Sequence, residues 1–170
     1  MTAIEETGTL VPGKSTHDSG QLSLGDATRT LPLPHLPYAD AVHAALRAVE
    51  VVPDLVEVGV RTETFEGQRE LFARLEWLPG HDDLVAADVA AAGLVVQWSH
   101  IAGWSVCAGA DVEVLEADDL ADPALIADAA LHAAVYGLAE KWVIPFEARW
   151  QHARELDIAL AQFDEREAVR

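Results

Sequence analysis

The segment 94–108, LVVQWSHIAGWSVCA, constrains the fold more than any other part of the chain. It contains two short runs rich in β-branched and aromatic residues, which a break at residues 101–103 separates. In both runs apolar residues alternate with small or polar ones, and this period is typical of a strand with one buried face. The sequence therefore predicts a β-hairpin that carries two tryptophans and supplies the centre of a sheet.

The rest of the chain contains the same two kinds of period. Alternation predicts three more strands, at residues 56–64, 70–77 and 112–115. Apolar residues at helical spacing predict four helices, at residues 38–50, 84–92, 123–136 and 145–163. Because the strands follow one another through turns, we expect an α+β fold: a mainly antiparallel sheet of about five strands, with helices packed on one face.

Composition divides the chain into three parts. Residues 1–36 are frequently Gly, Ser, Thr and Pro and predict a flexible tail, in which LPLPHLP favours an extended, polyproline-like segment. This segment is either a linker or strap across the domain, or a docking peptide for another protein. Residues 37–163 form a single predicted domain, and residues 164–170 are charged and predict a frayed end.

The charge is strongly acidic, with a formal net value of -18 for 170 residues. This balance disfavours direct binding of nucleic acid and of anionic membrane surfaces, and it favours a partner with a basic segment. Three explanations remain open: a charged surface that keeps the chain dissolved, a binding module for basic partners, and a nucleic-acid mimic. The acids occur singly and in pairs rather than in a long run, which argues against the mimic.

Other features bear on the compartment. Cys107 is the only cysteine, so an internal disulfide is excluded, and its place in a predicted strand favours a small buried side chain. No basic region followed by an apolar core is present at the start, and no apolar stretch approaches the length of a membrane span. We expect a cytoplasmic protein.

Signatures of catalysis are lacking in the sequence. It contains no phosphate-binding glycine loop, no GxSxG elbow and no HExxH motif. Ser99 and His100 are neighbours that point to opposite faces of a strand, whereas a catalytic triad needs them to converge. The helical pairs Asp128 with His132 and His152 with Glu155 supply only two potential metal ligands each. We therefore expect no metal and no cofactor, and favour a protein that is not an enzyme.

The aromatic residues suggest where a partner would bind. Trp104 follows a turn and Trp142 lies in a connector, so both are predicted to be partly exposed. With His100 at the hairpin turn and Trp150 on the stripe of the last helix, they are the candidate partner-contact residues. Packing in the core is the default interpretation for the tryptophans, and partial exposure of Trp104 and Trp142 is the exception.

Two segments carry a resemblance to a known group of proteins. GLVVQWSHIAGWSVCAG and LADPALIADAALHAAVYG resemble small acidic actinobacterial domains of unknown function, over residues 38–163. The resemblance implies no activity and no catalytic residues. The element order is also loosely similar to that of secretion-chaperone-like proteins, in which a helix-flanked antiparallel sheet dimerises and binds peptides. Those proteins place three strands first and two later, whereas this sequence predicts two and then three.

These observations lead to one main hypothesis and two alternatives. The main hypothesis is a non-enzymatic adaptor or chaperone-like module that binds a partner protein through the sheet face or the last helix. It includes a possible homodimer, which forms if the last helix leaves its apolar stripe outside the domain. The first alternative is a small-molecule-binding or hydrolytic domain whose pocket is lined by Trp98, His100 and Trp104, and the second is the nucleic-acid mimic.

Overall fold

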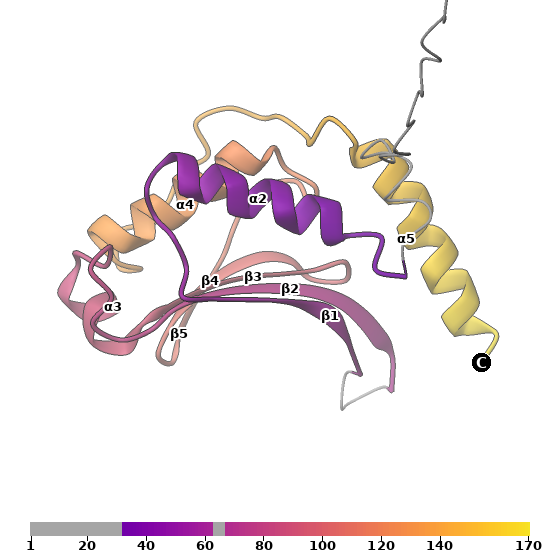
Figure 1. Ribbon diagram of the computed structural model, residues 1–170, viewed down its shortest axis with the longest axis horizontal. Helices are drawn as coiled ribbons and strands as arrows, with labels where there is room; N and C mark the ends of the chain where they lie inside the picture. Colours follow the sequence, from indigo (N-terminus) through magenta and orange to yellow (C-terminus); the bar gives the residue numbers. More distant parts are fainter. Residues whose placement is uncertain (1–31, 63–66) are drawn as a thin grey trace, which may run out of the picture.

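The computed structural model describes residues 32–62 and 67–170. The chain passes through helices and strands in an order that Figure 1 follows by colour. The elements are α2 (Leu36–Ala48), β1 (Leu55–Thr62), β2 (Arg69–Trp77), α3 (Ala87–Ala92), β3 (Leu94–Ser99), β4 (Gly103–Ala108), β5 (Asp111–Val114), α4 (Pro123–Tyr136) and α5 (Ala153–Ala168). The predicted tail of residues 1–36 lies largely outside the described residues.

The sheet is an antiparallel meander of five strands in chain order, β1-β2-β3-β4-β5. Its register places Ala73, Trp98 and Trp104 side by side on three neighbouring strands. These residues share one face with the other apolar members of the alternating pattern, as the sequence predicts. The α+β fold with a mainly antiparallel sheet is therefore confirmed.

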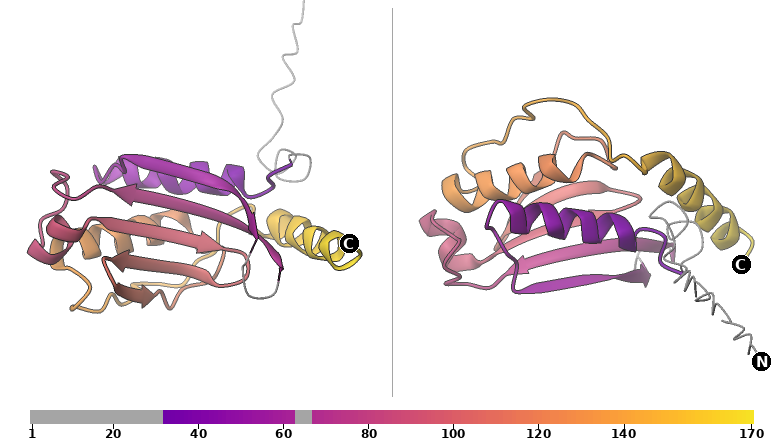
Figure 2. Two further views of the ribbon diagram at one scale, coloured as in Figure 1. Left: turned by 90° about the horizontal axis from the view of Figure 1, so that it is seen from below. Right: turned by 45° about the horizontal axis from the view of Figure 1, so that its top comes forward.

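Helices α2 and α4 lie together across one face of the sheet, and α5 lies at one end of it (Figures 1 and 2). Helix α4 begins where Asp122 accepts a hydrogen bond from the Ala124 backbone N–H at 2.9 Å, with Pro123 in the first turn. Both features favour a helix start, because they satisfy or remove N–H groups that lack partners within the helix. Its alanine-rich sequence lets α4 pack closely against both α2 and the sheet.

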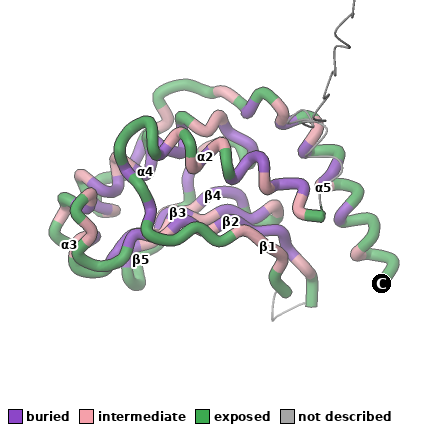
Figure 3. The backbone as a smooth tube through the Cα atoms, in the orientation of Figure 1, coloured by how far each residue is buried: buried purple, intermediate pink, exposed green. Residues whose placement is uncertain are grey.

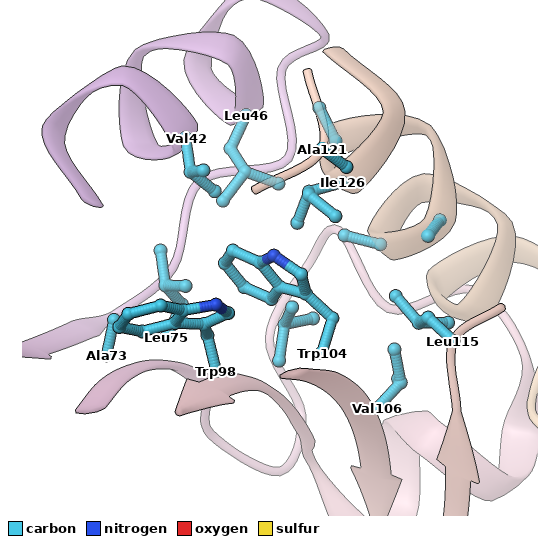
Figure 4. Close-up of a cluster of buried hydrophobic side chains, with 14 of the residues drawn as sticks. Val42, Leu46, Ala73, Leu75, Trp98, Trp104, Val106, Leu115, Ala121 and Ile126 are labelled. Atoms are coloured by element: carbon cyan, nitrogen blue, oxygen red, sulfur yellow. The ribbon is translucent and has the colours of Figure 1, made fainter. Parts of the chain in front are cut away.

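The core fills the space between the sheet and these two helices (Figure 4). Trp98 and Trp104 rise from the sheet, Val42 and Leu46 reach down from α2, and Ile126 comes from α4. All five side chains are at most 2% exposed. Burial of this much apolar surface is the main source of stability in a domain of this size.

Within residues 32–62 and 67–170, no helix lies over the opposite face of the sheet. In Figure 2 (left) the strands lie in front of α2 and α4, and no element crosses them. Its side chains in β3 and β4 are mostly half-buried, whereas the core face is almost fully buried (Figure 3). We call this uncovered side of the sheet the open face.

Three boundaries differ from the sequence prediction. The last helix begins at Ala153 rather than near residue 145, and it continues to Ala168, through residues that were expected to fray. The backbone before it is drawn into hydrogen bonds with another loop, so tertiary pairing overrides the helical period. At the other end, His35 is fully buried and Leu33 packs on the core, so the packed domain begins before residue 37.

Two smaller differences concern the end of β1 and the start of α3. Strand β1 ends at Thr62, and the remainder of the predicted strand 56–64 lies outside the described residues, as does part of the turn predicted at residues 66–68. Only residues 87–92 of the predicted helix 84–92 are helical, because the Val85 and Ala86 backbone N–H groups both donate to the Ala134 carbonyl of α4.

Candidate binding groove

Two irregular segments meet above the end of the tryptophan hairpin. One is the loop between β5 and α4, and the other is the connector between α4 and α5. The Trp150 N–H donates to the Leu120 carbonyl and the Asp122 N–H donates to the Ala148 carbonyl, both at 2.8 Å. The two segments are thus joined like a short antiparallel ladder and form one unit.

The tryptophan hairpin fixes the loop from below. Trp98 Nε1 donates to the Asp119 carbonyl at 2.7 Å. Trp104 Nε1 donates to the Tyr38 hydroxyl at 3.2 Å, and that hydroxyl donates to the Ala121 carbonyl at 2.7 Å. Burial raises the pKa of Tyr38, so the hydroxyl keeps its proton and remains a donor. Each indole therefore packs its ring in the core and uses its N–H to hold the loop.

The connector is fixed at both ends by tryptophans. Trp142 Nε1 donates to the Asp128 carboxylate of α4 at 2.8 Å, and the Trp142 backbone N–H donates to Glu113 at 3.1 Å. Trp150 packs on Tyr38, with ring centroids 5.1 Å apart. Between these two anchors Ile144 and Ala148 pack against the core, whereas Val143 and Phe146 are exposed.

Between the two segments lies a hollow of about 540 Å³. We call it the acidic groove. Its lining combines a small apolar floor with charged walls and consists of Glu116, Ala117, Asp118, Ile144, Glu147, Ala148 and Arg149. A volume of this size lies within the range typical of binding clefts.

The charges of the acidic groove are predominantly negative. Arg149 donates to Asp118 at 3.0 Å and to Asp157 of α5 at 3.0 Å, so two carboxylates already neutralise its charge. These partners, Asp118 first, raise the pKa of Arg149. Glu116 pairs with Lys141, but both side chains are mostly exposed, so the pair is weak. Within the described residues Glu147 makes no ion pair.

Asp119 lies beneath the groove wall. Its carboxylate approaches the backbone of Gly103 so closely that a Cβ at that position would lie 2.5 Å from Oδ1. Gly103 also has a φ of 71°, a conformation that favours glycine. Partial burial, followed by repulsion from Asp118, raises the pKa of Asp119. The hairpin turn and the groove wall are therefore packed against each other.

The structure corrects the expected exposure of the candidate contact residues. Trp104, Trp142 and Trp150 are at most 5% exposed, so the prediction that Trp104 and Trp142 lie partly at the surface is wrong. Their rings fill the interior and their N–H groups position the groove walls. They support the acidic groove from below and do not line it.

His100 lies at the tip of the hairpin, as predicted, but its side chain is only 3% exposed. Its Nδ1 accepts from the Leu71 backbone N–H at 3.0 Å, which leaves the proton on Nε2 to be donated to Asp164 at 2.9 Å. The ring also packs edge-on against Phe163. His100 thus joins α5 to the hairpin, and neither it nor Trp98 nor Trp104 lines the acidic groove.

The last helix does not present its stripe to solvent. The apolar residues Ala153, Leu156, Ala159 and Phe163 are at most 6% exposed. The sequence leaves a homodimer built on this stripe possible. Such a dimer would need the helix to move away from the rest of the domain.

The paired metal-ligand candidates have other partners. Asp128 accepts the Trp142 indole N–H, and His132 Nε2 donates to the Glu140 carbonyl at 2.8 Å. His152 packs against the Trp150 ring. In residues 32–62 and 67–170 no three His, Cys, Asp or Glu side chains gather in a way that suits a metal ion.

The helices of this same part of the chain are all too short or too polar to cross a membrane.

The groove residues are ones that sequence reasoning missed. The predicted helix 145–163 places residues 145–149 in a regular helix, and no motif of the sequence singles out Asp118. A usable signal is the connector itself, which has a tryptophan near each end and mixed apolar and charged residues between them.

Comparison with known proteins adds no relative. No protein-family model, no curated protein and no solved structure matches this chain.

Proposed function

We propose that this chain is a non-enzymatic protein-binding module that holds a short basic segment of a partner in the acidic groove. The observation that carries the proposal is a hollow with carboxylates on its walls and an apolar floor, in a chain of net charge -18. Lysine or arginine side chains of the partner would meet Glu116 and Glu147 at the rim. An apolar side chain between them would pack on Ile144 and Ala148.

Charge and shape have different roles in this proposal. The overall negative field attracts a basic segment from a distance and raises the rate of encounter. The apolar floor supplies the desolvated contact that decides which segment stays bound. Because both walls are tied to the tryptophan core, the groove exists before the partner arrives and little conformational entropy is lost on binding.

The test uses a fluorescent peptide of about eight residues in which lysine and arginine flank two leucines. We expect saturable binding by fluorescence anisotropy, and we expect Glu147→Lys to weaken it about tenfold, which corresponds to about 1.4 kcal/mol. Asp40→Lys is the matched control, because Asp40 is an exposed carboxylate of α2 outside the groove and the change in net charge is the same.

Two results would contradict the proposal. An equal loss of affinity in Glu147→Lys and Asp40→Lys would show that the peptide senses only the net charge. Equal affinity for a second peptide with serine in place of both leucines would show that the apolar floor makes no contact.

A further inference from the structure

Apart from the acidic groove, the open face is a further surface of the molecule, and its role is still unexplained. By the register of the sheet, its side chains alternate with those of the core. They are Leu55, Glu57, Gly59 and Arg61 of β1, Glu70, Phe72, Arg74 and Glu76 of β2, Val95, Gln97 and Ser99 of β3, Ser105 and Cys107 of β4, and Val112 and Val114 of β5.

The open face is nearly neutral in a strongly acidic molecule. It carries three glutamates and two arginines, a net charge of -1, whereas the whole chain carries -18. Its arginines are also paired: Arg61 with Glu70, and Arg74 with Glu76 at 2.9 Å. Two copies of such a chain repel each other in most orientations, and this face adds little to the repulsion.

The half of the open face formed by β3, β4 and β5 carries no charge and contains one apolar row. Val95, Cys107 and Val112 lie side by side across β3, β4 and β5. Val114 follows on the same side of β5, and both valines of that strand are more than 60% exposed. Apolar side chains gathered on one uncovered surface mark a contact site more often than isolated ones do.

We propose that the open face is where two copies of this chain pack against each other as a weak homodimer. A two-fold axis brings the same patch of both copies together, so a neutral, partly apolar face is complementary to itself. A basic partner would be attracted to the acidic surfaces instead of the open face. A second copy is repelled by those acidic surfaces, so the open face is the surface that it can contact. The inference is independent of the peptide-binding proposal.

The size of the face sets the expected strength. At about 3.3 Å per residue and about 4.8 Å between strands, the five strands cover on the order of 500 Å² per copy. Stable dimers usually bury about 800 Å² per partner. We therefore expect a reversible dimer with a dissociation constant on the order of micromolar.

The experiment is sedimentation equilibrium of the whole chain over a wide range of protein concentration. We expect the mass to rise from 18.3 kDa toward twice that value. Val114→Glu should weaken dimerisation at least tenfold, because it places a charge in the uncharged half of the face. Val85→Glu is the matched control, since Val85 is 68% exposed and lies outside the sheet, and it should leave dimerisation unchanged.

Cys107 reports directly on the face. Its thiol is partly exposed there, so the rate of alkylation should fall as protein concentration rises through the dimerisation range. A mass of 18.3 kDa at every concentration overturns the proposal. So does a dimer in which alkylation of Cys107 is independent of concentration, or in which the two glutamate variants behave alike, since that dimer uses another surface.

Discussion

The two sides of the sheet are built from the same strands and have opposite characters. On the covered side Leu71, Trp77 and Leu94 are completely buried, and every indole that has a hydrogen bond uses it to hold a loop or helix in place. On the open side Val112 and Val114 are exposed, and charges are paired within the surface. One side thus provides most of the core and holds the groove, whereas on the other Glu70, Phe72 and Ser99 are buried and the valines of β5 remain free for contact.

The largest expected effect is on stability and separates the two sides. Trp104→Ala removes a fully buried ring and the donor to Tyr38, and we expect it to lower the free energy of unfolding by about 3–5 kcal/mol. Val114→Ala on the open face should change it by less than about 0.5 kcal/mol. Urea denaturation of both variants measures the difference. Similar losses would mean that the open face is buried against something in solution.

The covered side also contains a titratable group whose protonation opposes folding. His35 is fully buried, stacks on Trp98 and donates from Nε2 to the Phe72 carbonyl at 2.9 Å, while Nδ1 has no partner in the described structure. Burial, with a smaller contribution from His100, lowers its pKa from 6.5 to about 4. The neutral ring is therefore the form that the folded chain accepts.

This shift predicts a specific pH dependence. Above pH 6.5 His35 is neutral in both the folded and the unfolded chain, so its full contribution is present. As the pH falls toward 4, only the unfolded chain gains the proton, and stability declines by roughly 3 kcal/mol. His35→Phe should remove this part of the decline, measured as the difference from wild type in urea titrations at several pH values. His43→Phe, in the helix α2 that follows His35, is the control, and an identical change in both variants would contradict the assignment.

Salt should act in opposite directions on the two surfaces. Screening weakens the attraction between the acidic groove and a basic peptide, and it reduces the repulsion between two acidic copies. Between about 0.05 and 0.5 M salt we expect peptide affinity to fall about tenfold and homodimerisation to strengthen a few-fold. Anisotropy and sedimentation on one preparation give both values. A parallel change in both would refute the contrast between the surfaces.

The smallest effect concerns the start of α4, where Asp122 pairs with Ala148 of the groove lining. Asp122→Ala removes the carboxylate that accepts the Ala124 N–H but keeps the backbone N–H that donates to Ala148. We expect a loss of about 1 kcal/mol in the free energy of unfolding, with peptide affinity unchanged within about twofold. Loss of binding at unchanged stability would show that the cap itself contacts the peptide.

The sequence is informative where structure depends on local periodicity. The alternation around Trp98 and Trp104 predicts the central hairpin and its buried face, and Asp122 followed by Pro123 predicts the start of α4 at the observed residue. These features depend on neighbours in the chain or on the choice between apolar and polar. Features of this kind can be recognised from a short window of sequence alone.

The acidic groove is not accessible to such reasoning. Its walls are joined by hydrogen bonds between residues 120–122 and 148–150, and no local pattern indicates this pairing. Helical spacing even argues against it, because Phe146 and Trp150 fit the period of α5. The predicted exposure of the tryptophans is wrong for a related reason. Trp142 lies in an irregular segment, yet its indole reaches Asp128 and is buried.

The hydrogen bond from Tyr38 to Ala121 spans 83 positions of the chain. During synthesis the sheet can form strand by strand as each hairpin leaves the ribosome, because its order follows the chain. Helix α2 is made before the strands that it covers, but it cannot complete its packing until residue 121 and α4 have emerged, since they supply the acceptor for its tyrosine and the neighbouring helix. It is thus made early and reaches its final place late, and until then its apolar side is a target for chaperones.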